Sequence, residues 1–221
     1  MSFYERLQGE TEQERNFLLS SPIISRCMNG DITLDDYVEF LAQAYHHVKH
    51  TVPLLMSAGA RLPEDKEWLR EAIAEYIEEE LGHQEWILND IAACGYDKEA
   101  VRNSRPAAAT ELMVAYAYDT INRVNPAGFF GMVLVLEGTS VTTADKAADA
   151  IKQALDLPGK AFSYLRSHGA LDQDHIKFFE SLMDKVTDEG DQEQIIHSAK
   201  MFYRLYADIF RTLTNNVAMA A

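Results

Sequence analysis

The sequence predicts an all-α protein, a single domain of seven or eight helices that spans residues 1–221. Three observations support this fold class. Apolar residues recur three or four positions apart along most of the chain, and no segment shows the convincing apolar–polar alternation of a strand. Proline and glycine interrupt this pattern only at short connections. The composition, with 47% hydrophobic and 25% charged residues among 221, is typical of a globular chain that buries one core.

The helices of the N-terminal part follow from these interruptions. The first fits residues 3–19, and Asn29-Gly30 marks a turn after it. Thr33 and Asp36 have the spacing of a capping box, which opens a long helix. Pro53 should kink or interrupt that helix, because proline has no amide hydrogen for the helical ladder.

The rest of the chain gives the same kind of signal. A helix rich in glutamate should begin after Pro63 and end near Gly95, because glycine favours a helix stop. The sequence does not decide whether the helix expected over residues 127–155 is broken around Gly138. The later helices are expected over residues 107–124, 127–155, 160–168, 170–186 and 193–217.

The charge balance excludes two classes of partner. There are 20 basic and 35 acidic residues, and the net charge of -15 repels nucleic acid and anionic membrane surfaces.

Residues 1–15 are charged almost at once, so they do not form a signal peptide. The longest strongly apolar run, residues 129–136, is far shorter than a bilayer span. We therefore expect a cytoplasmic protein.

Two sets of metal-ligating side chains have helical spacing. Residues three, four or seven apart share one face of an α-helix. Glu80 and His83 form one such pair. His168, Asp172 and His175 form a second set with the pattern H-x3-D-x2-H. Within each set, the side chains are therefore predicted to point in one direction from their helix. Such spacings also arise by chance on exposed faces.

Glu137 adds a carboxylate within an otherwise apolar helix, GMVLVLEGTS. An ionised carboxylate among apolar side chains is costly unless a metal or another charge compensates it. A solvent-facing Glu137, or one paired with arginine, is an equally good interpretation of this residue alone. Three carboxylates and three imidazoles together favour redox-active iron or manganese over structural zinc.

The order of these motifs resembles one known family. An E-x2-H pair, a single glutamate about 50 residues later and then H-x3-D-x2-H resemble the heme-oxygenase-like dimetal oxidases. Ferritin-like bundles fit less well, because Ser140 stands where a second Glu-x-x-His pair would have histidine. The wider superfamily includes heme oxygenase, the thiaminase II group and the pyrroloquinoline-quinone synthase.

The resemblance implies a heme-oxygenase-like bundle with two iron ions, or manganese as the alternative metal. Its partners would be dioxygen and a small-molecule substrate, and we expect a homodimer. Some N-oxygenating members carry an extra glutamate where this chain has Ile73, which argues against that chemistry. No catalytic residue beyond the metal ligands is assigned. The implied ligands are Glu80, His83, Glu137, His168, Asp172 and His175.

A ligand histidine usually donates its second ring N–H to a carboxylate or carbonyl. Glu79, Asp174 and Glu180 are the candidate carboxylates for that role. These side chains would orient the imidazoles without binding the metal themselves.

Two alternatives remain open. A metal-free thiaminase-type hydrolase or transferase needs a nucleophilic cysteine, and the chain offers Cys27 and Cys94, which are more typical of inert packing residues. A non-enzymatic ligand-binding or interaction module on the same fold is the other.

Three side chains of one helix are candidates for a substrate pocket. Tyr45, His46 and His50 lie on the helix that Thr33 opens, with His46 and His50 on one face. One histidine there could also be an axial heme ligand, and a polar helix face is an equally good interpretation. The aromatic segment 202–210 has helical spacing and is expected in the core or at a subunit interface.

Overall fold

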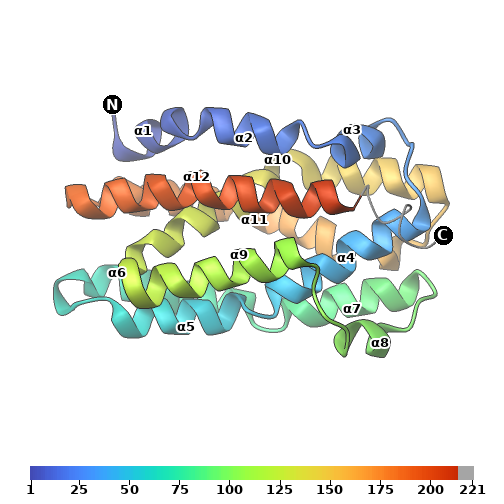
Figure 1. Ribbon diagram of the computed structural model, residues 1–221, viewed down its shortest axis with the longest axis horizontal. Helices are drawn as coiled ribbons and strands as arrows, with labels where there is room; N and C mark the ends of the chain where they lie inside the picture. The colour runs from blue at the N-terminus through green and yellow to red at the C-terminus, as the bar shows by residue number, and fades with distance from the viewer. Residues whose placement is uncertain (214–221) are drawn as a thin grey trace.

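The computed structural model describes residues 1–213 and, within them, every side chain except those of residues 168–174. This part of the chain forms an elongated bundle of helices without a β-strand (Figure 1). The all-α prediction is confirmed. The first half contains the helices α1 (Phe3–Glu10), α2 (Glu12–Leu19), α3 (Pro22–Met28), α4 (Leu34–Val48), α5 (Thr51–Arg61), α6 (Glu67–Glu80) and α7 (His83–Ala93).

The second half of the bundle contains five helices, of which the last three are the longest in the described chain. They are α8 (Lys98–Arg102), α9 (Ala108–Asp119), α10 (Phe129–Leu155), α11 (Ser163–Met183) and α12 (Glu189–Thr212). Short helical turns cover residues 64–66, 126–128 and 159–161, and a π-helical turn extends α9 over Thr120–Val124. Residues 1–213 thus contain more helices than the seven or eight expected, because several predicted helices are divided.

Two local predictions are confirmed. The Asp36 amide donates to Thr33 Oγ1 at 3.1 Å and the Thr33 amide donates to Asp36 Oδ2 at 3.0 Å, which completes the capping box of α4. The long helix that begins there ends at Val48, and α5 starts at Thr51. Pro53 therefore lies in the first turn of α5, where its missing amide hydrogen leaves no helical bond unmade.

Other boundaries differ from the prediction. Residues 3–19 are divided at Thr11, whose hydroxyl donates to the Leu7 carbonyl at 2.8 Å. Helix α3 was not expected, although proline at its first position is a common helix start. Residues 163–183 form one helix where two were predicted, and α10 continues through Gly138. A glycine inside a helix costs only about 1 kcal/mol, so packing overrides it.

Helix α10 is the centre of the bundle and packs against both α11 and α12. It is apolar and long enough to cross a membrane, but 67% of its most apolar window is buried inside the protein, as in the core helix of a soluble fold. At Gly131 an added Cβ would lie 2.5 Å from the Ala199 amide nitrogen, so glycine allows α12 to approach α10 closely. Phe202, Tyr203 and Tyr206 on α12 are buried, which places the aromatic segment in the core.

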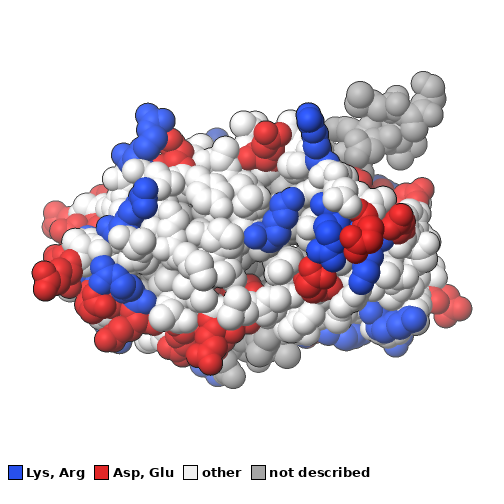
Figure 2. All heavy atoms as spheres, turned by 90° about the horizontal axis from the view of Figure 1, so that it is seen from below, with Lys and Arg blue, Asp and Glu red and all other residues white. Residues whose placement is uncertain are grey.

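Charged side chains are unevenly distributed over the surface. On the face seen from below, they gather toward the two ends, and uncharged surface fills most of the region between (Figure 2). The charged side chains that give the net charge of -15 are therefore not spread evenly over this face.

Candidate functional site

A break between α6 and α7 positions the first pair of candidate ligands. Glu80 is the last residue of α6, His83 is the first residue of α7, and Gly82 between them has φ +91°. That value lies in the left-handed region that favours glycine. The predicted continuous helix is therefore wrong here. The pair nevertheless stays together, with His83 Nδ1 3.1 Å from Glu80 Oε2.

His175 joins two other helices at the same part of the bundle. Its Nδ1 lies 3.7 Å from Glu137 Oε1 on α10, and its Nε2 lies 2.8 Å from Glu79 Oε2 on α6. The His175 and Glu137 side chains are only 8% and 11% exposed, so Glu137 does not face solvent. The Glu79 contact is of the kind expected for a carboxylate that orients a ligand imidazole. The Tyr76 ring lies 6.0 Å from the His175 ring, and burial together with the Glu137, Glu79 and Glu80 carboxylates raises the pKa of Tyr76.

The other two candidate ligands of α11, His168 and Asp172, lie outside the described side chains. Among the side chains that are described, no group of three or more His, Cys, Asp or Glu is arranged so that it could hold a metal ion. The six-ligand set therefore remains a prediction from the sequence.

The described candidates nevertheless fit a cation by their chemistry and burial. Glu80 is 12% exposed and His83 is 2% exposed. In the described part of the chain, the ion pair of Glu80 is with His83, and neither lysine nor arginine pairs with it. A buried carboxylate needs compensating charge, and an oxygen and imidazole donor set suits iron or manganese.

A cavity of about 150 Å³ lies against these carboxylates. Its α10 wall extends from Phe129 to Ile151, which is about 33 Å of helix at 1.5 Å per residue. Glu80 and Glu137 both line it, and most of the remaining wall is apolar, with side chains such as Ile23, Phe40, Leu55, Met132, Val133 and Leu136. The arrangement suits an elongated apolar molecule beside the carboxylate and histidine cluster.

The histidines of residues 46–50 are divided between this cavity and a separate cleft, and His50 lies beyond the end of α4, at the N-cap of α5. Of Tyr45, His46 and His50, none is among the described residues that line the cavity, whereas His47 lines it. His46 and His50 line a cleft between α4 and α9. Successive helical residues are about 100° apart, so His47 faces a different neighbour from the His46 and His50 face. The sequence predicted all three candidates on one helix, whereas the structure ends that helix before His50 and places His47 at the cavity wall.

Polar contacts explain why His46 stays in the second cleft. Its Nε2 lies 2.9 Å from Ser104 Oγ, and Lys49 Nζ lies 3.1 Å from its Nδ1. Burial and the Lys49 ammonium lower the pKa of His46 to about 4. His50 Nδ1 lies 3.2 Å from the Tyr118 hydroxyl. Tyr45 is buried in the core beside these residues.

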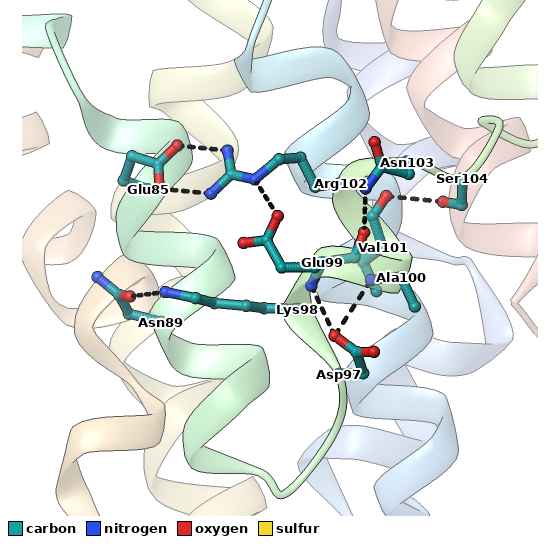
Figure 3. A network of polar contacts seen from close by, with 10 residues as sticks. All are labelled: Glu85, Asn89, Asp97, Lys98, Glu99, Ala100, Val101, Arg102, Asn103 and Ser104. Atoms are coloured by element: carbon teal, nitrogen blue, oxygen red, sulfur yellow. Dashed lines mark hydrogen bonds and ion pairs between the residues drawn. The ribbon is translucent and has the colours of Figure 1, made fainter.

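An arginine network fixes the short α8 against α7, the helix that begins with His83 (Figure 3). Arg102 donates two hydrogen bonds to Glu85, at 2.7 and 2.9 Å, and a third to Glu99 at 3.0 Å. Planar bidentate pairs of this kind are geometrically specific. The network thereby also positions Ser104, which follows α8 and contacts His46.

Neither cysteine has the environment of an activated nucleophile. Cys27 and Cys94 are buried, and burial raises the pKa of each thiol to about 11. A thiol with that pKa is protonated at neutral pH, whereas the thiolate is the reactive species.

Comparison with known proteins assigns the chain to a family. The model of the family described as "Iron-containing redox enzyme" matches residues 38–207. No curated protein sequence matches the chain. A domain of unknown function with a heme oxygenase-like fold from Shewanella denitrificans superimposes with a TM-score of 0.86 at 24% identity, covering 98% of this chain and 94% of that one.

Two further solved structures share the fold at lower identity. A TenA homolog from Pseudomonas syringae pv. tomato has a TM-score of 0.79 at 11% identity, covering 96% of this chain and 93% of that one. The heme oxygenase of Leptospira interrogans has a TM-score of 0.74 at 19% identity, covering 96% of this chain and all of that one, 100%. The expected heme-oxygenase-like fold is thus confirmed.

Proposed function

Because the chain belongs to the family of iron-containing redox enzymes, we propose that it is an iron-dependent oxidoreductase with a two-metal carboxylate and histidine site. It would activate dioxygen there and oxidise a small organic substrate. The observation that carries this proposal is the position of His175 between Glu79 and Glu137, which brings α6, α10 and α11 together beside the cavity.

The metal ligands would be Glu80, His83, Glu137, His168, Asp172 and His175. When bound, two ferrous ions, or manganese in their place, supply electrons for the reduction of dioxygen. Three carboxylates among these ligands balance most of the charge of two divalent ions.

The described side chains have further roles in this proposal. Glu79 Oε2 lies 2.8 Å from His175 Nε2 and so fixes the direction of the imidazole toward Glu137. Tyr76 and the apolar residues of the cavity wall exclude bulk water from the carboxylates, which strengthens their interactions with a bound cation. The cavity wall favours a substrate that is mainly apolar and elongated.

The rival functions are less well supported. A thiaminase-type mechanism needs a reactive thiolate, and burial raises the pKa of both Cys27 and Cys94. An interaction module without chemistry would not need carboxylates and imidazoles buried together beside a cavity. A homodimer in the cytoplasm remains our prediction, as does the absence of nucleic acid and membrane partners.

Metal loading tests the proposal directly. After anaerobic incubation with Fe(II) and removal of excess metal, we expect about two iron ions per chain, by elemental analysis. Exposure of the loaded protein to air should then consume dioxygen. A chain that retains no iron, in a preparation whose circular dichroism shows the helical fold, would exclude the proposed function.

A further inference from the structure

The cavity contains two buried hydroxyl groups that have no hydrogen-bond partner in the described structure, those of Tyr76 and Ser140. Both lie next to the candidate metal ligands in sequence. Tyr76 precedes Glu80 by one turn of α6, and Ser140 follows Glu137 by one turn of α10. The two hydroxyls therefore belong to the part of the cavity where Glu80 and Glu137 lie.

Three other hydroxyls of the same cavity have hydrogen-bond partners in the protein. The Tyr37 hydroxyl donates to the Ala161 carbonyl at 2.7 Å. Thr139 and Thr143 donate to the carbonyls four residues earlier in α10, at 2.6 and 2.7 Å. Missing partners are thus not a general property of the cavity wall.

An unpaired buried hydroxyl lowers the stability of a protein, because folding removes it from water without replacing the hydrogen bond. Such a group calls for an explanation, and a bound ligand that supplies the partner is one. The Tyr116 hydroxyl also has no described partner, but Tyr116 packs against Phe202 and does not line this cavity. The Tyr116 hydroxyl is therefore a control, because it cannot contact a ligand in this cavity.

We propose that Tyr76 and Ser140 are substrate-positioning residues, whose hydroxyls donate hydrogen bonds to an oxygen atom of an elongated, otherwise apolar ligand in the cavity. The neighbouring Glu80 and Glu137, when ionised, offer only acceptors, whereas the Tyr76 and Ser140 hydroxyls can donate. The inference rests on the proposed function only in calling that ligand the substrate.

The first test measures thermal unfolding of the metal-free protein. Tyr76→Phe and Ser140→Ala each remove an unpaired hydroxyl, so each variant should unfold about 2–4 °C higher than the wild type. Tyr37→Phe removes a satisfied hydrogen bond from the same cavity and should unfold at a lower temperature. A lower unfolding temperature for Tyr76→Phe would show that its hydroxyl has a partner and would overturn the proposal.

The second test measures binding of 1-decanol, a long apolar chain with one hydroxyl oxygen, to the same metal-free proteins by calorimetry. We expect Kd to rise about fivefold in Tyr76→Phe and in Ser140→Ala, the equivalent of one hydrogen bond. Tyr116→Phe should leave Kd unchanged. Equal affinity in Tyr76→Phe and wild type, or no binding to the wild type, would overturn the proposal. Both tests use metal-free protein. A failure of iron loading would therefore contradict the proposed function without changing the unfolding temperatures or the affinities for 1-decanol.

Discussion

His175 Nε2 lies 2.8 Å from Glu79 Oε2, and this contact links α11 to α6 next to Glu137. Glu79 is 42% exposed, whereas His175 is 8% exposed, so the carboxylate reaches inward from the surface to hold a buried imidazole. The contact leaves Nδ1 of His175 directed to the Glu137 side, where its distance to Oε1 is 3.7 Å.

Loss of this contact should weaken metal binding without removing a ligand. For Glu79→Gln we expect Fe(II) affinity to fall by about 10- to 100-fold, because carboxylates that orient ligand histidines typically contribute that much. Anaerobic titration measures it. The matched control is Glu78→Gln, the exposed neighbour in α6, which should bind iron as the wild type does. Equal affinities for the two variants would remove Glu79 from the site.

Replacement of a proposed ligand should have the larger effect. His175→Ala is expected to abolish both iron loading and dioxygen consumption, because the ligands act as one set. Cys94→Ala should retain both, since the proposed chemistry needs no thiol. Oxygen-electrode measurements on anaerobically loaded proteins would compare them. Dioxygen consumption that persists in His175→Ala but is lost in Cys94→Ala would contradict the proposed site.

The break at Gly82 should be required for stability. Gly82→Ala places a side chain at φ +91°, which costs about 1–3 kcal/mol although no atom crowds the added Cβ. Gly138→Ala, inside α10 with no atom near the added Cβ, should instead stabilise by about 0.5–1 kcal/mol. Urea unfolding of both variants measures the difference. If Gly82→Ala were as stable as Gly138→Ala, the break between α6 and α7 would not depend on glycine.

The buried His46 should make stability depend on pH in a defined window. Its pKa is lowered from 6.5 to about 4 in the folded protein, so the unfolded chain binds a proton between these values and the folded protein does not. Stability is therefore fully present above about pH 6.5 and decreases as the pH falls toward 4. In His46→Gln, urea unfolding should show a weaker dependence in this window than in the wild type. An identical slope would mean that His46 is protonated in the folded protein.

Local sequence patterns determined much of this fold. The helical periodicity, the capping box at Thr33 and the proline at position 53 act within a few residues, so they could be recognised without tertiary information. The carboxylate and imidazole pattern likewise identified Glu80, His83, Glu137 and His175. In the structure His83 contacts Glu80, and His175 contacts Glu137 and Glu79. The roles of these residues as ligands remain predictions.

What only the tertiary structure decided depends on contacts between distant segments. The spacing of Glu80 and His83 is the same in a continuous helix and in the broken one, so the turn at Gly82 left no sign in the periodicity. Likewise, His46 and His47 look equivalent in sequence, and the packing of α9 on one side of α4 and of the cavity on the other assigns them different roles. Residues that share a helical face can be predicted from a 100° step, but the neighbour that covers each face is chosen by the packing of the whole bundle.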